Sequence, residues 1–439
     1  MNLFGGVIPI TGITFLMFSI FAIIAVGFAL GRITIKGISL GDAGVFLVAL
    51  LFGCLFYGAL DAQLTVKLDL ASLSVEARQI IESLDIDTTV SYTTNALKII
   101  ENLGLILFVT SVGFIAGPKF FGNFKKNFKS YVVLALVVIL AGGLAAAGCI
   151  LFGRTVIGTE NPDELTAMIV GILAGALTST PAFSASKEAV GSALESTVAT
   201  GYGIAYIFGV IGVVLFVQLI PKIVRANMDV EREKLLASSA GAEKGETKKK
   251  ERKLFEIDGH GFAAFALAAI IGVFIGMIKI PLTSAGLSGT CFSLTTTGGC
   301  LLTSLVFGHF ANIGPVSIMP KDSTLKIFKE LGLILFLAGA GVAGGAKFVE
   351  LFKPEYFIYG MIMTIVPMIA GYFFAKYVLK LSLLNNLGSL TGAMTSTPAL
   401  GTLIGVSKTD DVASAYAATY PIALISVVLI SQLIVIIFK

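Results

Sequence analysis

The sequence contains no tryptophan, and only 13% of its 439 residues are charged. A soluble globular protein carries charge on about a quarter of its residues, so this scarcity of charge excludes an ordinary soluble fold. Hydrophobic residues make up 56% of the chain instead, and the mean hydropathy is +0.93. These values predict a polytopic membrane protein.

Residues that commonly act in catalysis or bind metals are also scarce. The chain has two histidines and four cysteines, and the cysteines lie in apolar stretches without paired spacing: Cys54, Cys149, Cys291 and Cys300. Neither a disulfide framework nor a zinc site is therefore expected. The sequence holds no phosphate-binding Gly-x-x-x-x-Gly-Lys-Ser/Thr loop and no nucleophile spaced from a base. An enzyme, an ATP-driven pump and a bound cofactor are accordingly not expected.

Long apolar segments are what the chain has in abundance. Most have about 18–25 residues, the length that crosses a bilayer as an α-helix. They fall near residues 7–31, 43–60, 97–117, 130–153, 165–182 and 197–221, then 261–279, 291–313, 330–346, 355–379, 385–405 and 412–438. The first is interpreted as a membrane helix rather than a signal peptide, because no basic residue precedes it. A polar insert at 61–96 has apolar residues at helical spacing within 77–84, which predicts a short surface helix.

One eleven-residue stretch occurs twice. Gly171–Pro181 and Gly388–Pro398 share eight of eleven positions, including two glycines four apart and the run Thr-Ser-Thr-Pro. Glycines at this spacing let two helices approach closely, whereas proline interrupts one helix and favours the start of another. Each copy is interpreted as a broken helix, with a half-helix that begins at Thr180 or Thr397. Thr180 is the predicted N-cap and Pro181 the first helical residue.

The repeat extends beyond this stretch. Leu103–Phe108 is identical to Leu331–Phe336, and Ser-Lys pairs at 186–187 and 407–408 follow the two motifs. Several matches in the same order indicate a duplication. The chain then divides into a first transmembrane repeat at 1–221, a charged cytoplasmic linker at 222–259 and a second transmembrane repeat at 260–439. The linker is expected to be a helix extension followed by a flexible tether.

Basic residues set the expected orientation of the repeats. Cytoplasmic loops are enriched in Lys and Arg, which places the loops near 32–36 and 119–129 and the linker on the same side. That arrangement requires an odd number of crossings between 165 and 221, where only two apolar blocks are present. A segment that doubles back at Thr-Ser-Thr-Pro, or splits into extra spans, satisfies the count. The sequence thus predicts an all-α membrane protein of two inverted repeats with discontinuous or re-entrant helices, both termini outside.

The start of a half-helix carries free N–H groups and favours an anion, and paired broken helices in inverted repeats are the plan of secondary transporters. The candidate substrate-binding residues therefore come from the two motifs and the tyrosines that follow them: Gly175, Thr178, Ser179, Thr180, Pro181 and Tyr202, with Gly392, Thr395, Ser396, Thr397, Pro398 and Tyr420. Asn312 is added because it is polar inside an apolar block. In the alternative interpretation, these glycines and hydroxyls only pack helices together.

Charged residues after the motifs have two interpretations. Lys187, and Lys408 in the second copy, would either neutralise a substrate carboxylate or extend to the membrane interface, which is the favoured interpretation. Glu188 and Glu195 are interpreted as loop residues, although an acid there would suit coupling to H⁺ or Na⁺. The tyrosines would either line a cavity or anchor helices at the interface.

Gly-x-x-x-Gly-Ala-x-Thr-Ser-Thr-Pro-Ala in duplicate, with Tyr420-Pro421 in the last apolar segment, resembles the aspartate:alanine exchanger family of bacterial and archaeal carriers. The resemblance covers both membrane halves. It implies exchange or export of small carboxylates or amino acids, such as aspartate, alanine or C4-dicarboxylates, across a prokaryotic plasma membrane. It also implies an inverted-repeat fold with outward-facing termini and, by analogy, a homodimer. Many relatives carry two regulatory domains between the halves, where this chain has only the short linker.

Two other function classes compete with a carrier. Half-helix dipoles also line channel pores, but the sequence shows neither a carbonyl selectivity filter nor a ring of charges. A membrane enzyme is disfavoured because the chain is poor in catalytic residues. A small anion and the lipid bilayer are the expected partners, with no nucleic acid.

Overall fold

The structure is a computed structural model, and it describes residues 2–3, 8–35, 38–39, 43–67, 89–122, 128–158, 161–239, 257–281, 291–409 and 411–438. The surface helix expected at 77–84 and residues 240–256 of the linker lie outside these ranges. Eight helices in the described part are long and apolar enough to cross a membrane. This confirms a helical, multi-pass membrane protein, in which each spanning backbone bonds within its own helix.

The helices follow the same order in both repeats. The first repeat contains α1 (Gly12–Gly31), α2 (Ala43–Leu64), α4 (Thr93–Gly122), α5 (Phe128–Phe152) with the π-helical turn η3 (Gly153–Ile157), α6 (Pro162–Ala176), α7 (Thr180–Val190) and α8 (Glu195–Ile223). The linker holds α9 (Met228–Ser239). The second repeat contains α10 (Phe262–Gly276), α11 (Thr295–Phe310), α12 (Asp322–Gly345), α13 (Phe348–Leu351), α14 (Glu355–Phe373) with η6 (Phe374–Val378), α15 (Leu383–Ala393), α16 (Thr397–Ser407) and α17 (Val412–Phe438).

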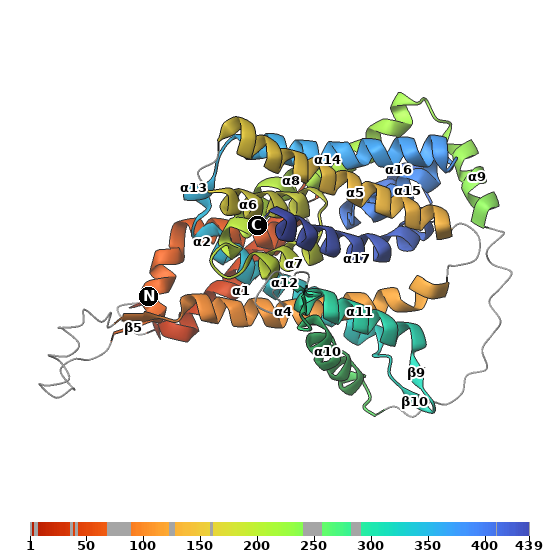
Figure 1. Ribbon diagram of the computed structural model, residues 1–439. Helices are drawn as coiled ribbons and strands as arrows, with labels where there is room; N and C mark the ends of the chain where they lie inside the picture. The colour runs from red at the N-terminus through yellow and green to blue at the C-terminus, as the bar shows by residue number, and fades with distance from the viewer. Residues whose placement is uncertain are drawn as a thin grey trace, which may run out of the picture.

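Strands occur only as short antiparallel pairs in the described residues. The pairs are β1–β2 (Asn2–Leu3, Ile8–Pro9), β3–β4 (Thr34–Ile35, Ile38–Ser39), β5–β6 (Thr65–Lys67, Thr89–Ser91), β7–β8 (Ile280–Pro281, Cys291–Phe292) and β9–β10 (Asn312–Ile313, Val316–Ser317). They mark the two ends of the molecule. The end with β5 and α13, on the left of Figure 1, is called the insert end, and the end with α9 and β9–β10, on the right, is called the linker end.

The helices form two bundles. The first bundle contains α1, α2, α4, α10, α11 and α12, and α4 packs against both α11 and α12. The second bundle contains α5 to α8 and α14 to α17, in which α6 packs on α8 and α15 on α17. Figure 1 shows α5, α14 and α17 of the second bundle above α4, α10 and α11 of the first. Each bundle therefore takes corresponding helices from both repeats.

Gly104 of α4 and Gly332 of α12 form a reciprocal contact between the repeats. A Cβ on Gly104 would lie 2.6 Å from the Gly332 carbonyl oxygen and 2.4 Å from the Phe336 nitrogen. A Cβ on Gly332 would lie 2.6 Å from the Gly104 oxygen and 2.4 Å from the Phe108 nitrogen. Only glycine permits this approach. Because equivalent residues exchange the same contacts and the helices run antiparallel, the repeats are inverted copies about an approximate two-fold axis.

The helices α6 and α8 run parallel, which shows how the first motif folds. A Cβ on Gly171 would touch Val198, and one on Gly175 would touch Tyr202, so residue numbers rise together along the two helices. The chain between them must return to its starting side, and α7 makes that return. The pair α6–α7 is therefore a re-entrant hairpin, called the first hairpin.

The second repeat folds in the same way. Gly388 of α15 lies against Val412 of α17, and Gly392 lies against Tyr416. The helices α15 and α17 are therefore parallel, and α15–α16 is a second re-entrant hairpin, called the second hairpin. Each hairpin enters the protein and leaves on the same side. Of the two arrangements that satisfy the count of crossings, this is the segment that doubles back.

The linker begins with structure of its own. The helix α8 ends at Ile223, and α9 follows at Met228. Glu231 of α9 accepts a hydrogen bond from the Leu383 N–H at the start of α15, with a nitrogen–oxygen distance of 2.9 Å. The described part of the linker thus packs on the second hairpin at the linker end.

Candidate functional site

The tips of the two hairpins meet inside the second bundle. Thr178 donates from Oγ1 to the Met394 carbonyl oxygen at 3.0 Å, and Thr395 donates from Oγ1 to the Leu177 carbonyl oxygen at 2.8 Å. Both threonines are buried and have positive φ, at 52° and 51°. Positive φ is uncommon for a β-branched residue, so the backbone at each tip is held by this contact.

The half-helices begin as predicted, but their caps lie one residue earlier. The half-helix α7 starts at Thr180, and its N-cap is Ser179, not Thr180. The half-helix α16 likewise starts at Thr397 with Ser396 at the N-cap. Pro181 consequently occupies the second helical position rather than the first. The physical reason is the left-handed threonine at each tip, which turns the chain so that the serine precedes the new helix.

The two hairpins differ at these serines. Ser179 Oγ accepts a hydrogen bond from the Ala182 N–H at 3.3 Å and so caps α7, whereas Ser396 makes no cap hydrogen bond. Ser396 is 0% exposed, and its Oγ has no hydrogen-bond partner in the described part of the chain. A buried polar group without a partner is costly, so Ser396 is a hydroxyl that a ligand would satisfy. The side chains of Thr397 and Pro398 lie outside the described residues.

Tyr202 lies beside the first tip in an aromatic cluster. Its ring stacks on Phe183 with centroids 4.2 Å apart and planes 9° apart, and it meets Phe46 of α2 edge-on at 5.2 Å. The Tyr202 hydroxyl is buried and lies toward the Thr180 side chain without a hydrogen bond of ordinary geometry. The tyrosine is thus inside the protein and not at a membrane interface.

The remaining motif residues pack the second bundle. A Cβ on Gly175 would lie 2.6 Å from the Tyr202 carbonyl oxygen, and one on Gly392 would lie 2.6 Å from the Tyr416 carbonyl oxygen. Tyr420 is half-buried and stacks on Tyr416 with centroids 5.1 Å apart. The glycines therefore allow each hairpin to lie close against the parallel helix that follows it.

Asn312 does not belong to this site. The helix α11 ends at Phe310, and Ala311 with φ 59° turns the chain into the β9–β10 hairpin. Asn312 is exposed there, with its side chain donating to the Gly314 carbonyl oxygen at 3.5 Å. The expectation that Asn312 lies inside an apolar helix is therefore wrong, because α11 ends at Phe310.

Two charged residues pair deep in the protein. Lys187 Nζ of α7 lies 2.5 Å from Glu101 Oε1 of α4, and the two side chains are 5% and 9% exposed. The interface position favoured for Lys187 is therefore wrong, because a carboxylate on the neighbouring bundle holds the ammonium inside. Sequence analysis missed Glu101, although a carboxylate within an apolar segment is itself a signal of function. Lys408, which follows a serine in the second copy as Lys187 does in the first, is exposed.

Glu188 and Glu195 also join the bundles, so their assignment to loops is wrong. Glu188 on α7 accepts hydrogen bonds from the Thr296 N–H and the Thr297 hydroxyl, both at 2.7 Å. A carboxylate in this place is stabilised by the N-terminus of α11. Glu195 begins α8 and lies 3.2 Å from Lys98 of α4. No three His, Cys, Asp or Glu side chains in the described ranges gather as metal ligands.

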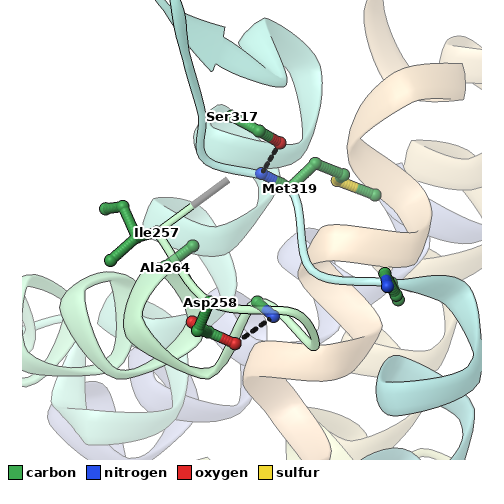
Figure 2. A pocket seen from close by; sticks show the side chains of 7 residues that line it. Ile257, Asp258, Ala264, Ser317 and Met319 are labelled. Carbon is green, nitrogen blue, oxygen red and sulfur yellow. Dashed lines mark hydrogen bonds between the residues drawn. The ribbon is translucent and has the colours of Figure 1, made fainter. Parts of the chain in front are cut away.

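Three hollows among the described residues lie away from the hairpin tips. Figure 2 shows a small one between Asp258 and Ala264 on one side and Ser317 and Met319 on the other, with a volume of about 20 Å³. A larger hollow of about 500 Å³ lies at the linker end, and one of about 400 Å³ at the insert end. Residues of the two motifs line none of the three. The tips are therefore packed together in this conformation.

The chain is similar to known membrane permeases in both halves. A family model for aspartate–alanine exchangers, described as a predicted permease membrane region, matches residues 56–222 and 264–436. An uncharacterized transporter of Bacteroides fragilis is 26% identical over 95% of this chain and 97% of its own length. Uncharacterized transporters of Desulfotalea psychrophila and Rhodopirellula baltica are 24% and 23% identical over 96% and 92% of this chain and 97% and 96% of their own lengths. The first alignment spans 573 positions against 439 residues here, so that relative has residues without a counterpart in this chain.

Proposed function

Since the chain belongs to the aspartate–alanine exchanger family of membrane permeases, we propose that it is a secondary active transporter that exchanges or exports small carboxylates or amino acids. Relatives that it matches over almost their whole length are named transporters. Aspartate, alanine and C4-dicarboxylates are the candidate substrates. The transported group would be a carboxylate in each case.

The contact between the two hairpin tips is the observation that carries this proposal. The half-helices α7 and α16 both begin at that contact, and the start of a helix presents N–H groups to an anion. Ser396 adds a buried hydroxyl without a hydrogen-bond partner among the described residues, and Tyr202 adds another near Thr180. A substrate carboxylate would separate the tips slightly and bond these donors.

Alternating access would come from movement of one bundle against the other. The two-fold contact at Gly104 and Gly332 lies within the first bundle, and the two tips lie within the second. Each bundle thus keeps its own internal symmetry. A tilt that brings the bundles together at one end would part them at the other, as expected for inverted repeats.

The proposed location is the plasma membrane of a prokaryote, with the insert end outside and the linker end in the cytoplasm. Both termini then face outside. Cysteines introduced singly at Tyr92 and Glu233, both exposed, in a variant that lacks the native cysteines would test this orientation. We expect a membrane-impermeant maleimide added to intact cells to label position 92 only. Labelling of both positions, or of position 233 alone, would contradict the orientation.

Counterflow tests the transport activity directly. Purified protein in liposomes loaded with unlabelled L-aspartate, L-alanine or succinate should accumulate the labelled form of the same compound, with a saturable rate. Gradients of H⁺ or Na⁺ imposed on the same vesicles would identify the coupling ion. A channel, the rival interpretation, would equilibrate label without accumulating it. Failure to accumulate any of the three compounds would overturn the proposed function.

A further inference from the structure

The Glu101–Lys187 pair is one of several polar contacts that join the two bundles at the insert end. The carboxylates of Glu188 and Glu195 reach the first bundle there as described above. Gln432 of α17 donates from Nε2 to the Leu294 carbonyl oxygen at 3.3 Å, and Thr200 of α8 donates from Oγ1 to the Gly344 carbonyl oxygen at 3.3 Å. The bundles are thus joined at this end, and any movement that opens it must part Lys187 from Glu101.

Parting these two charges requires new partners for both. Each side chain is more than nine-tenths buried, and a charge that loses its partner in the interior is strongly destabilising. Glu101 remains near Lys98, one turn earlier on the same helix. For Lys187, the neighbouring carboxylate on its own half-helix, Glu188, already bonds the start of α11.

The Lys187 ammonium lies near Phe183, which is closer to the hairpin tip along α7. Helical side chains tilt toward the N-terminus of their helix, and Nζ of Lys187 lies 5.8 Å from the centre of the Phe183 ring, one turn nearer the tip. Phe183 in turn stacks on Tyr202, whose hydroxyl lies toward Thr180. A ligand bound at the tip would therefore extend toward the ammonium along the face of α7.

The second repeat has no equivalent of this pair. The identity of Leu103–Phe108 with Leu331–Phe336 places Lys329 where the first repeat has Glu101. Lys187 is the eighth residue of α7, and the eighth residue of α16 is Ile404, whereas Lys408 is exposed in the C-cap of α16 with φ 54°. Of these equivalent positions, the first repeat has a buried cation at Lys187 and the second has none.

We propose that Lys187 is a substrate-binding residue that exchanges partners, pairing with Glu101 while the insert end is closed and with a substrate carboxylate while it is open. The inference rests on the proposed function and narrows its substrate class to dicarboxylates and acidic amino acids. Such a substrate places one carboxylate at the tips, beside Ser396, and a second at Lys187. A neutral amino acid such as alanine has no second carboxylate and gains nothing from Lys187.

The test removes the charge of Lys187 without leaving the Glu101 carboxylate unpaired. Lys187→Met leaves Glu101 buried and unpaired, so the double variant Glu101→Gln/Lys187→Met, which leaves no charge, is the informative one. Lys408→Met, which removes an exposed lysine of the second repeat, is the control. In liposomes we expect the double variant to keep the unfolding temperature of the wild type but to need at least tenfold more succinate or L-aspartate for half-maximal counterflow. The L-alanine concentration for half-maximal counterflow should change less than twofold. The Lys408→Met variant should match the wild type for all three compounds.

The possible failures are distinguishable. Unchanged succinate and L-aspartate affinity in the double variant would overturn the role of Lys187 and leave the carrier function standing. An equal loss of apparent affinity for all three compounds, or a double variant that does not fold, would show that the pair is a fixed structural element. Either result would overturn the inference as well. A wild-type protein that accumulates none of the three compounds would overturn the proposed function, and the role of Lys187 with it.

Discussion

Thr178 and Thr395 occupy equivalent places in the two repeats, and each donates a hydrogen bond to the carbonyl oxygen of the residue before the other. The contact mirrors the reciprocal approach of Gly104 and Gly332 in the first bundle. Both bundles therefore have a symmetric centre built from duplicated residues. The centre of the second bundle is the one with hydroxyls and helix starts, which is why substrate binding is placed there.

The two hydrogen bonds of the tip contact, one from Thr178 and one from Thr395, should stabilise the protein equally. Thr178→Val and Thr395→Val keep the branched shape but leave a buried carbonyl oxygen without its donor, which costs about 1–3 kcal/mol. We expect both variants to lower the unfolding temperature of the purified protein in detergent to a similar extent. The double variant should deviate from additivity because the two bonds lie side by side. A large effect at one threonine and none at the other would contradict a symmetric contact.

Ser179 and Ser396 should respond in opposite ways to alanine. Ser179→Ala removes a helix cap and should cost about 1 kcal/mol of stability, with little change in substrate affinity. Ser396→Ala removes a hydroxyl that makes no hydrogen bond in the described part of the chain, so stability should hold. A hydrogen bond to a carboxylate contributes about 1.5–3 kcal/mol, so affinity should fall roughly tenfold to a hundredfold. Binding and thermal unfolding measured on both variants separate the two roles, and an unaltered affinity for Ser396→Ala would place the substrate elsewhere.

Much of this architecture is readable from the sequence because it is encoded locally. Thr-Ser-Thr-Pro contains the residue that turns the chain, the serine that caps and the proline that favours a new helix start, so each break follows from adjacent residues. The re-entrant path follows from a count of basic loops. The position of each cap was missed by one residue, because the left-handed turn at Thr178 is set by the opposite hairpin and not by its own neighbours.

The part of the site that sequence analysis missed depends on contacts across the fold. Glu101 and Lys187 are far apart in the chain and come from different bundles, so neither residue reveals the other. Lys187 alone resembles the many lysines that reach a membrane interface. Asn312 shows the opposite case. Its apolar neighbours in the sequence predicted a place inside a helix, although α11 ends at Phe310.

The glycine contact between the repeats should tolerate no side chain. A Cβ on Gly104 would lie 2.4 Å from a backbone nitrogen of α12, so Gly104→Ala must push the two helices apart. Overpacking of this kind costs about 1–3 kcal/mol or more. Gly148→Ala in α5 is the matched control, because a Cβ there meets nothing within 4 Å. We expect loss of folded protein in size-exclusion chromatography for Gly104→Ala only, and equal yields would argue against the close approach of α4 and α12.

Asp258 lies at the start of α10, outside the membrane-spanning segments. Its carboxylate should make the stability of the protein depend on pH. Its carboxylate accepts hydrogen bonds from the N–H groups of His260, Gly261, Phe262 and Ala263 at 2.6–3.0 Å, and Figure 2 shows one of these bonds. The backbone donors hold the pKa of Asp258 at about 2, below the ordinary value of 3.8.

The sign of the effect follows from that direction. Above the unfolded-state pKa of about 3.9 the carboxylate is ionised in both states, and its contribution to stability is complete. As pH falls from about 4 to about 2, the unfolded chain takes up the proton first, so the contribution is lost progressively. Asp258→Ala should therefore unfold at a lower temperature than the wild type at pH 7, with a difference that shrinks between pH 4 and pH 2. Circular dichroism in detergent across this range measures it, with Glu233→Ala on α9 as an exposed carboxylate control, and a difference that stays constant to pH 2 would show that the charge of Asp258 does not support the helix.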